Sequence, residues 1–338
     1  MTNKYFTDAR ESGILELMTI QEIYDLAVDM GIKADPRGEK TVKELLAKRK
    51  KEHSGLSDKK KRYFDPETLL NPYSDSRMLY GDPKKEIKKI LTGVDADVAE
   101  VLMVDRLNEK GAGIGLLLAH HPDGHALSSL HEVMAMQVDM YAKAGVPVNV
   151  ADALFHERMG EVQRRFNPIN HGKTVDAARL MDVPLMALHT IWDNMGNAFM
   201  EDYLGDKKFD TAGEVLEAVQ EIPEFVEAMK SKSGPSLVSG TPSSRAGRLM
   251  VSFTGGTNPS VKLYEQLAKA GVGTLVEMHV GEDALKKLRE LHINVIDAGH
   301  MAADSIGANL FFDELERRGV EVVVCSGLVR VSRKAKKA

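Results

Sequence analysis

The feature that most constrains this chain is a segment that occurs twice. Residues 112–121 begin with Ala-Gly-Ile-Gly and end in His121, and residues 270–279 begin with Ala-Gly-Val-Gly and end in His279. In both copies a helix-like segment ends at Ala-Gly, an apolar strand-like run follows, and a histidine closes the run. Strands that alternate with helices indicate a mainly parallel α/β layer. The repeat therefore predicts an α/β fold made of two related lobes.

Two adjacent histidines end the apolar run of the first copy. Residues 115–119 are followed by His120, His121 and Pro122. A run of this length predicts a buried strand, and the carboxyl end of such a strand faces the edge where α/β proteins bind ligands. Neighbouring side chains on a strand point to opposite faces, but this alternation relaxes at a strand end, so both imidazoles could face one crevice. The pair is either a set of metal ligands or two half-exposed loop histidines.

A second motif, His-x-x-x-Asp, occurs at matching places in the two halves. His189 and Asp193 follow an apolar run in the first half, and His300 and Asp304 follow one in the second. If a helix starts at each histidine, residues four apart lie on the same face of that helix. Each half would then present one imidazole and one carboxylate from the end of a strand. The motif alone is a common accident, but its recurrence within a repeat predicts one composite metal site.

A glycine turn and a short polar loop are weaker candidates for contacts with a substrate. Thr254, Gly255 and Gly256 lie between an apolar strand and a helix, an arrangement that can bind an anion, although the lysine of a P-loop is missing. Asp123 and His125 follow the two adjacent histidines. They either face the substrate or serve only as turn residues.

Changes in composition along the chain predict how the lobes are divided. A stretch rich in Ser, Gly and Pro separates the two halves, and a long helical segment interrupts the first. We expect the last strand, at residues 320–326, to belong to the second lobe. The predicted divisions are an N-terminal helix with a charged insertion (1–65), the first lobe (66–230) with a helical insertion (128–182), a linker (231–247), the second lobe (248–330) and a basic tail (331–338).

The composition excludes several classes of protein. No apolar run approaches the roughly 20 residues of a membrane helix, and the first residues lack the apolar core of a signal peptide. The single cysteine, Cys325, rules out an intrachain disulfide and a cysteine-rich zinc site, and it fits a reducing cytosol. The basic runs 48–51 and 59–62 either bind phosphate or nucleic acid or, as is more typical, form solvated helix faces, and the net charge of −5 gives no general bias toward nucleic acid. We therefore expect a cytoplasmic protein with no membrane or nucleic-acid partner.

Three motifs follow one another along the chain: His120-His121-Pro122, then His189-Thr190-Ile191-Trp192-Asp193, and finally Asp297-Ala298-Gly299-His300 with Asp304. In this order they resemble the NIF-three-like family of dinuclear-metal proteins, which carries the older description GTP cyclohydrolase 1 type 2. Each motif alone is weak, whereas the combination is fairly specific. The resemblance covers about residues 66–127, 183–204 and 248–326.

The resemblance implies a set of ligands for two divalent metal ions. Nitrogen and oxygen donors without thiolate suit Zn, Fe, Mn, Co or Ni, and the sequence does not choose among them. The family usually has a glutamate that bridges the metals where this chain has the shorter Asp304. The family forms a ring-shaped hexamer, so the resemblance also implies a homo-oligomer. The implied ligands are His120, His121, Asp193, His300 and Asp304, with His189 and Asp297 as further ligands or neighbours of ligands.

These ligand types lead to two hypotheses about function. The first is a metal-dependent hydrolase that uses a metal-bound water to attack a small molecule such as a nucleotide or a phosphoester. In this hypothesis no side chain is assigned a catalytic role of its own. The second is a non-catalytic protein that binds or handles metal, or that acts as a scaffold.

Overall fold

The apolar run before the two histidines forms a strand that is buried on both faces. This strand, β5 (Leu116–Ala119), lies between β4 (Lys89–Gly93) and β6 (Leu185–Leu188), and it is parallel to both. At one edge of the sheet β11 (Glu321–Val324) pairs in parallel with β4, and at the other β2 (Ser76–Tyr80) pairs antiparallel with β6. The computed structural model describes residues 17–334.

A second sheet repeats this topology. Its strands β8 (Arg248–Ser252), β9 (Val272–Glu277) and β10 (Asn294–Asp297) are parallel, and β7 (Ser236–Ser239) is antiparallel to β10 at the edge. In each sheet the antiparallel edge strand precedes the parallel strands in the chain; it pairs with β6 in the first sheet and with β10 in the second. The predicted α/β fold with mainly parallel strands is confirmed.

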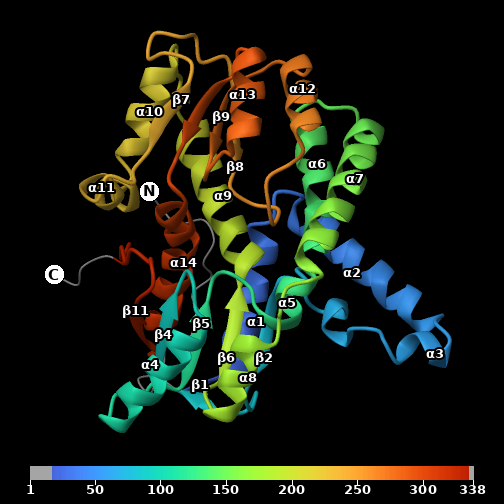
Figure 1. Ribbon diagram of the computed structural model, residues 1–338, viewed down its shortest axis with the longest axis vertical. Helices are drawn as coiled ribbons and strands as arrows, with labels where there is room; N and C mark the ends of the chain where they lie inside the picture. The colour runs from blue at the N-terminus through green and yellow to red at the C-terminus, as the bar shows by residue number, and fades with distance from the viewer. Residues whose placement is uncertain (1–16, 335–338) are drawn as a thin grey trace.

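Two long helices connect the sheets at the centre of the molecule. Helix α9 (His189–Gly205) directly follows β6, and α14 (His300–Arg317) follows β10. The two helices pack against each other between the sheets (Figure 1). Because each helix begins at the carboxyl end of a strand, the first turns of both helices meet where the two sheets face each other.

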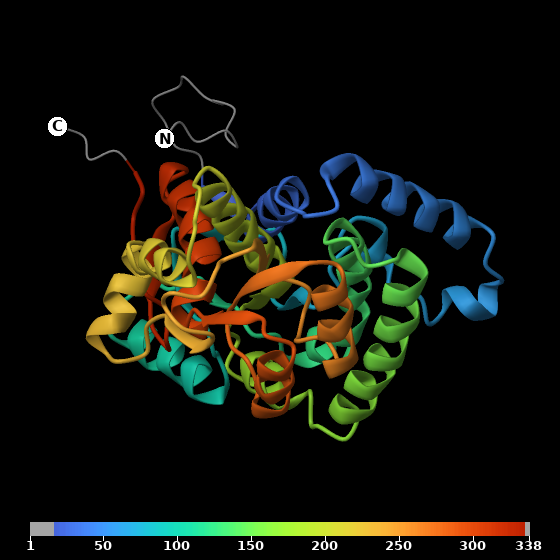
Figure 2. The ribbon, with the colours of Figure 1, turned by 90° about the horizontal axis from the view of Figure 1, so that it is seen from above.

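The segment between β5 and β6 is helical, as predicted. Its helices α6 (Met136–Lys143) and α7 (Val148–Phe166) pack beside α12 (Val261–Lys269) of the second lobe (Figure 2). Their apolar side chains form one core cluster with those of the second sheet. The elements of this segment are α5 (Gly124–Ser128), the 3-10 helix η2 (Leu130–Ala135), α6 (Met136–Lys143), α7 (Val148–Phe166) and α8 (Lys173–Leu180).

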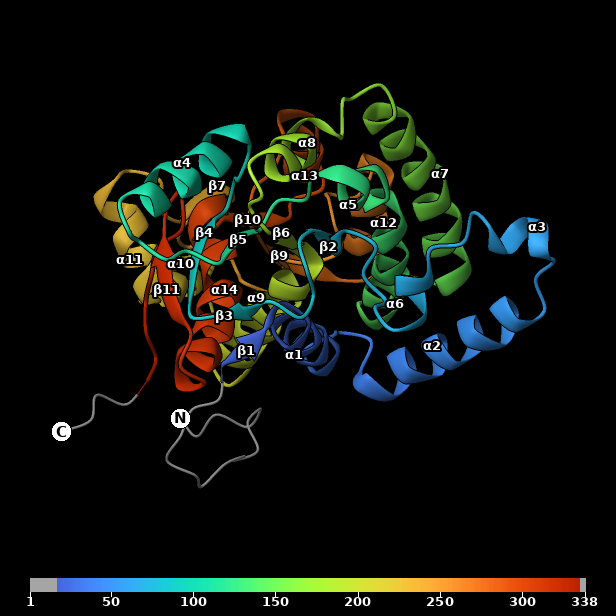
Figure 3. The same cartoon turned by 90° about the horizontal axis from the view of Figure 1, so that it is seen from below.

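The N-terminal helix begins at a capping box. Thr19 caps α1 (Ile20–Lys33) and forms a reciprocal capping box with Glu22. Gly31 lies inside the helix, where a Cβ would lie 3.1 Å from Ile191, so the missing side chain lets α1 and α9 approach each other closely. Beyond it, the charged helices α2 (Glu39–Ser54) and α3 (Asp58–Lys61) extend away from the body (Figure 3). Short strands β1 (Met18–Thr19) and β3 (Glu86–Ile87) pair beside α1.

The structure corrects the predicted place of the last strand. β11 joins the sheet of the first lobe, whereas the sequence predicted it in the second. Val322 and Val324 pack against one core cluster of the first lobe and Val323 against another, so both faces of the strand find apolar partners there. The alternation of strands and helices along the chain carries no information about which sheet a strand joins.

One smaller prediction also differs from the structure. The predicted linker contains β7, the antiparallel edge strand of the second sheet. The segment before it forms two helices, α10 (Ala212–Gln220) and α11 (Pro223–Lys230), because Pro223 starts a new helix at its first position. The remaining helices are α4 (Val98–Glu109), α13 (Glu282–Glu290) and the 3-10 helix η1 (Pro66–Leu69). Among residues 17–334, no helix has the length and apolarity needed to span a bilayer.

Candidate metal centre

The ends of three parallel strands bring the histidines of the first lobe together. Because β4, β5 and β6 are neighbours in register, the residues that follow them lie side by side at one edge of the sheet. His120 and His121 follow β5, and His189 follows β6 directly as the first residue of α9. The second lobe adds His300, the first residue of α14.

His120 lies at the centre of this group and is fully buried. Its Nδ1 lies 3.2 Å from the carbonyl oxygen of Leu188, and its ring stacks on that of Trp192 with centroids 5.5 Å apart. Its Nε2 lies 3.2 Å from Oδ1 of Asp193 and 3.5 Å from Oδ1 of Asp304. When Nδ1–H donates to the carbonyl of Leu188, Nε2 of the neutral ring turns a lone pair toward two carboxylates.

Several buried side-chain atoms around His120 lack hydrogen-bond partners of good geometry among the described residues. They include Nε2 of His120, Oδ1 of Asp193 and both carboxylate oxygens of Asp304. Buried polar atoms are nearly always satisfied, so electron pairs that face one another need a cation or a proton between them. This arrangement fits a metal ion.

The carboxylate of Asp304 faces two sides of the group. Its Oδ1 lies toward His120, while its Oδ2 lies 3.7 Å from Nε2 of His121 and 3.4 Å from Nε2 of His300. Imidazole nitrogens and carboxylate oxygens that could hold a metal ion form three overlapping sets whose members lie within 4.8 Å of one another, so residues from both halves of the chain lie together. The sets are His120 with His121 and His189, His121 with His300 and Asp304, and His120 with Asp193 and Asp304.

Two aspartates that the sequence did not single out orient the histidines. Asp95 Oδ1 lies 2.7 Å from Nδ1 of His121, and Asp75 Oδ2 lies 2.8 Å from Nδ1 of His189. Thr190 also donates its hydroxyl to Asp75, at 2.6 Å. A carboxylate that holds Nδ1–H leaves Nε2 as the donor atom for a metal, which is the usual arrangement around metal-binding histidines.

Only one of these two aspartates could have been found from the sequence. Asp95 comes just after the strand β4, so the argument that applied to the ends of β5 and β6 applies to it as well. Asp75 precedes β2, and only the antiparallel pairing of Ser76 with Leu188 brings it next to His189. No local pattern in the sequence signals that pairing.

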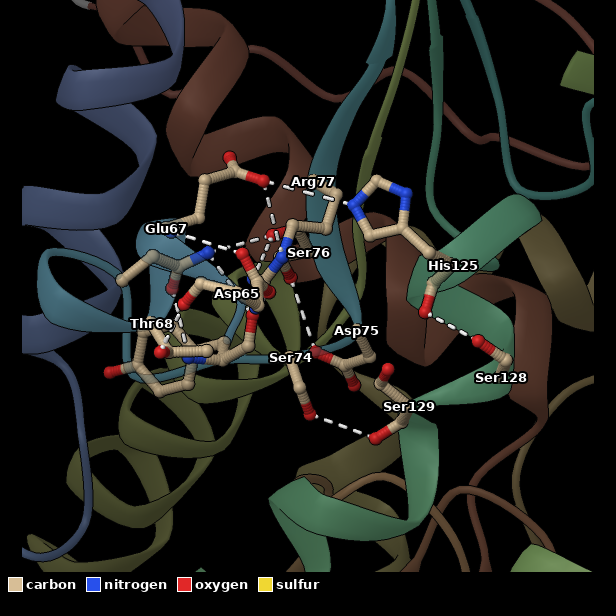
Figure 4. A network of polar contacts seen from close by, with 12 residues as sticks. Asp65, Glu67, Thr68, Ser74, Asp75, Ser76, Arg77, His125, Ser128 and Ser129 are labelled. Carbon is tan, nitrogen blue, oxygen red and sulfur yellow. Dashed lines mark hydrogen bonds and ion pairs between the residues drawn. The ribbon is translucent and has the colours of Figure 1, made fainter. Parts of the chain in front are cut away.

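A buried arginine fixes the segment that carries Asp75 (Figure 4). Arg77 is fully buried and donates to the carbonyl oxygens of Tyr73 and Ser76. Its guanidinium also forms ion pairs with Asp65 at 3.0 Å and Glu67 at 3.3 Å. Burial would raise the pKa of Asp75, but His189, Thr190 and Arg77 outweigh it and lower that pKa. Asp75 is therefore held as a carboxylate.

The charges in the group act differently on its histidines. Burial alone would lower the pKa of His120, but the carboxylates of Asp304 and Asp193 outweigh it and hold that pKa well above its usual value. Burial and the neighbouring His120 and His189 lower the pKa of His121 to about 4. His121 therefore stays neutral and able to coordinate a metal at physiological pH, whereas a metal would have to displace a proton from His120.

A cavity of about 190 Å³ opens beside the group. Of the weaker sequence candidates, Thr254 and Gly256 line this cavity, and Gly255 lies behind it with its carbonyl hydrogen-bonded to Gln137 at 2.5 Å. The other three candidates lie outside the cavity. Asp123 caps α5, exposed His125 lies 3.8 Å from Glu67, and Asp297 accepts from the amide of Gly299 at 3.2 Å.

The fold has a counterpart among solved structures. The NIF3 superfamily protein from Sphaerobacter thermophilus superposes with a TM-score of 0.71 at 25% identity, over 92% of this chain and 99% of that one. HcgD from Methanocaldococcus jannaschii (TM-score 0.48, 17% identity, 78% and 93% of the two chains) and a Bacillus cereus protein related to NIF3 (0.45, 12%, 95% and 99%) are more distant. Neither a protein-family model nor a curated protein sequence matches this chain. The predicted resemblance is thereby confirmed for the fold.

Proposed function

We propose that this chain, which has the fold of the NIF3 superfamily protein, binds divalent metal ions and hydrolyses a small molecule beside them. The observation that carries the proposal is the contact of His120 Nε2 with the carboxylates of Asp193 and Asp304, buried and without a hydrogen bond of good geometry. A divalent cation bound there would act as a Lewis acid and lower the pKa of a coordinated water, which is the chemistry that hydrolysis needs.

The proposal includes two ions that share Asp304. One ligand set contains His120, Asp193 and Oδ1 of Asp304, and another contains His121, His300 and Oδ2 of the same aspartate. The two carboxylate oxygens of a single residue thus face separate sets of ligands. This supports a bridging role for Asp304, although its side chain is one methylene shorter than that of a glutamate.

The residues of the chain divide the work at such a site. Asp75 and Asp95 hold the rings of His189 and His121, and the mixture of nitrogen and oxygen donors suits Zn, Mn, Fe, Co or Ni. Helices α9 and α14 both begin at the site, and the partial positive charge at their N-termini favours an anionic substrate group. The cavity is small, so the reacting part of the substrate is compact.

The test begins with metal content. Elemental analysis of protein purified without chelator should find about two equivalents per chain, and hydrolysis of a panel of nucleotides and phosphoesters should require added Mn or Zn. Asp193→Ala and Asp304→Ala should each lose metal and activity. His125→Ala is the matched control, because this histidine is exposed and lies outside the cavity. Activity that survives either aspartate substitution would refute the proposal.

A second outcome would favour the non-catalytic alternative. Stoichiometric metal that depends on Asp193 and Asp304, with no turnover across the panel, would leave a protein that binds or handles metal. The geometry of the ligand sets is needed for either function, so the panel of substrates is the part of the experiment that separates the two functions.

A further inference from the structure

The cavity beside the candidate ligands is lined by two kinds of side chain. Imidazoles and carboxylates of the metal group line part of it. Apolar Leu130 and Phe166, which both come from the helical insertion, also line it, together with Thr254, Gly256, Thr257 and Asn258 of the glycine turn. A molecule in this cavity can therefore meet polar ligands and apolar side chains at the same time.

The two apolar side chains are fixed by their packing. Phe166 is the last residue of α7, is half-buried, and packs on the core cluster that the insertion shares with the second lobe. Leu130 is buried within that same cluster. Deeper in α7, Phe155 packs edge-on against Tyr141 of α6, with ring centroids 5.0 Å apart. The position of Phe166 thus follows from a packed core and not from a loose loop.

The insertion also holds the glycine turn that lines the cavity. The buried Gln137 donates from Nε2 to the carbonyl oxygens of Gly255 at 2.5 Å and Thr257 at 2.8 Å. Gly256 has a φ of +85°, and a Cβ there would lie 2.7 Å from Val133 of the insertion. The turn and the insertion therefore form one unit across the two lobes.

Several flat side chains line the cavity. The imidazoles of His279 and His300 line it with ring centroids 4.6 Å apart, and Phe166 adds a phenyl ring. Flat rings pack well against other flat rings in offset or edge-on geometry. A cavity of about 190 Å³ lies below the roughly 300–1,000 Å³ of sites for drug-sized ligands, so it fits one ring with a small polar group.

We propose that Phe166, with Leu130, selects a substrate that carries a single flat ring next to the group that meets the metal ligands. This inference rests on the proposed metal site and names the class of molecule that the site takes. The substrate class is a small molecule with one aromatic or heteroaromatic ring beside a polar group that can meet a metal ion. Phe166 is a specificity-determining residue, since it contacts the ring and not the reacting atoms.

The experiment compares two phosphonates that share one metal-binding head. Protein loaded with Mn²⁺ is titrated calorimetrically with phenylphosphonate and with methylphosphonate. The native protein should bind phenylphosphonate about tenfold more tightly, because burial of a ring adds apolar contact. In Phe166→Ala this preference should fall below about threefold, with the affinity for methylphosphonate unchanged. Phe209→Ala removes another half-buried ring, which lines a separate cavity, and should keep the preference.

The outcomes separate this inference from the proposed hydrolase function. No preference in the native protein, a preference that survives in Phe166→Ala, or no binding of either phosphonate would overturn the inference. A preference that depends on Phe166, in a protein that hydrolyses nothing in the panel, would support the ring-binding wall and count only against hydrolysis. Equal metal content in all variants shows that Phe166→Ala acts on the ring and not on the ligands.

Discussion

At the scale of single residues, the contacts of the histidine Nδ1 atoms matter as much as those of the Nε2 atoms that would bind a metal. Asp75 and Asp95 make the same contact, to Nδ1 of His189 and of His121, in different surroundings. Partners of this kind typically change metal affinity by about 10–100-fold when they are removed. We therefore predict that Asp75→Asn and Asp95→Asn each weaken metal binding by a factor in this range, measured by equilibrium dialysis with Mn or Zn.

The two variants should differ in stability, which separates positioning from folding. Asp75 is fully buried and also accepts from Thr190, so its substitution should lower the free energy of unfolding by about 1–3 kcal/mol. The Asp95 side chain is 71% exposed, and its substitution should leave stability nearly unchanged. Undiminished metal affinity in Asp95→Asn would show that this carboxylate does not orient His121.

A second residue-scale prediction concerns pH and a buried acid outside the ligand group. Burial is the main cause that raises the pKa of Glu277 from 4.5 to about 8; Tyr264 opposes the shift and Asp297 adds to it. The folded protein keeps this proton while the unfolded chain releases it above pH 4.5, so native stability falls as pH rises toward 8. The cost at pH 7 is on the order of 3 kcal/mol, from about 1.36 kcal/mol per pH unit.

Glu277→Gln removes this titration and keeps an oxygen that can accept from Tyr264. Urea unfolding at pH 5 and pH 8 should show that the variant gains on the native protein as pH rises. Glu265→Gln is the comparison, because this half-buried acid pairs with Lys287 and its pKa is lowered by that contact. A constant difference between the native protein and Glu277→Gln would mean that Glu277 is ionised in the fold.

At the scale of elements, the crossing of α9 and α14 determines whether the two halves of the site meet. A glycine lies seven residues after the motif histidine in both helices, Gly196 after His189 and Gly307 after His300. A Cβ on Gly307 would overlap the carbonyl oxygen of Trp192, whereas a Cβ on Gly196 would have its nearest neighbour at 3.6 Å. The duplicated position is thus under strict steric constraint in only one copy.

This difference predicts opposite effects for the same substitution. Gly307→Ala should destabilise the protein by about 1–3 kcal/mol or more and weaken metal binding, because it forces apart the helices that carry Asp193 and Asp304. Gly196→Ala should be neutral or stabilise by up to about 1 kcal/mol, since alanine favours helix. Thermal unfolding and metal content of both variants provide the measurement. Equal effects would mean that the crossing is not limited by contact at Gly307.

The elements that the sequence could predict were those with a local signature. The strand ends at His120, His189 and His300 could be predicted, because an apolar strand and the helix that follows it have different hydrophobic periods. The pairing of strands that lie far apart in the chain could not be predicted. For this reason the role of Asp75 and the place of β11 were missed. The position of Phe166 at the cavity could not be predicted either, because it depends on how the insertion packs against the other lobe.

At the scale of the whole molecule, duplication suggests two independent lobes, but the packing joins them. The chain returns from α14 to the first sheet through β11, and the helical insertion of the first lobe packs into the core of the second. The candidate ligands likewise come from both halves. We infer that the halves fold as one cooperative unit.

The single tryptophan reports on this cooperativity. Trp192 is fully buried in α9, stacks on His120, and packs against Phe311 and Phe312 of α14 with ring centroids 6.1 and 5.2 Å apart. Its fluorescence therefore follows the contact between the lobes, whereas far-UV circular dichroism follows all helices. In urea, the two signals should change with the same midpoint and slope, as two-state unfolding requires. A fluorescence transition at lower urea than the dichroism transition would show that the lobes separate before they unfold.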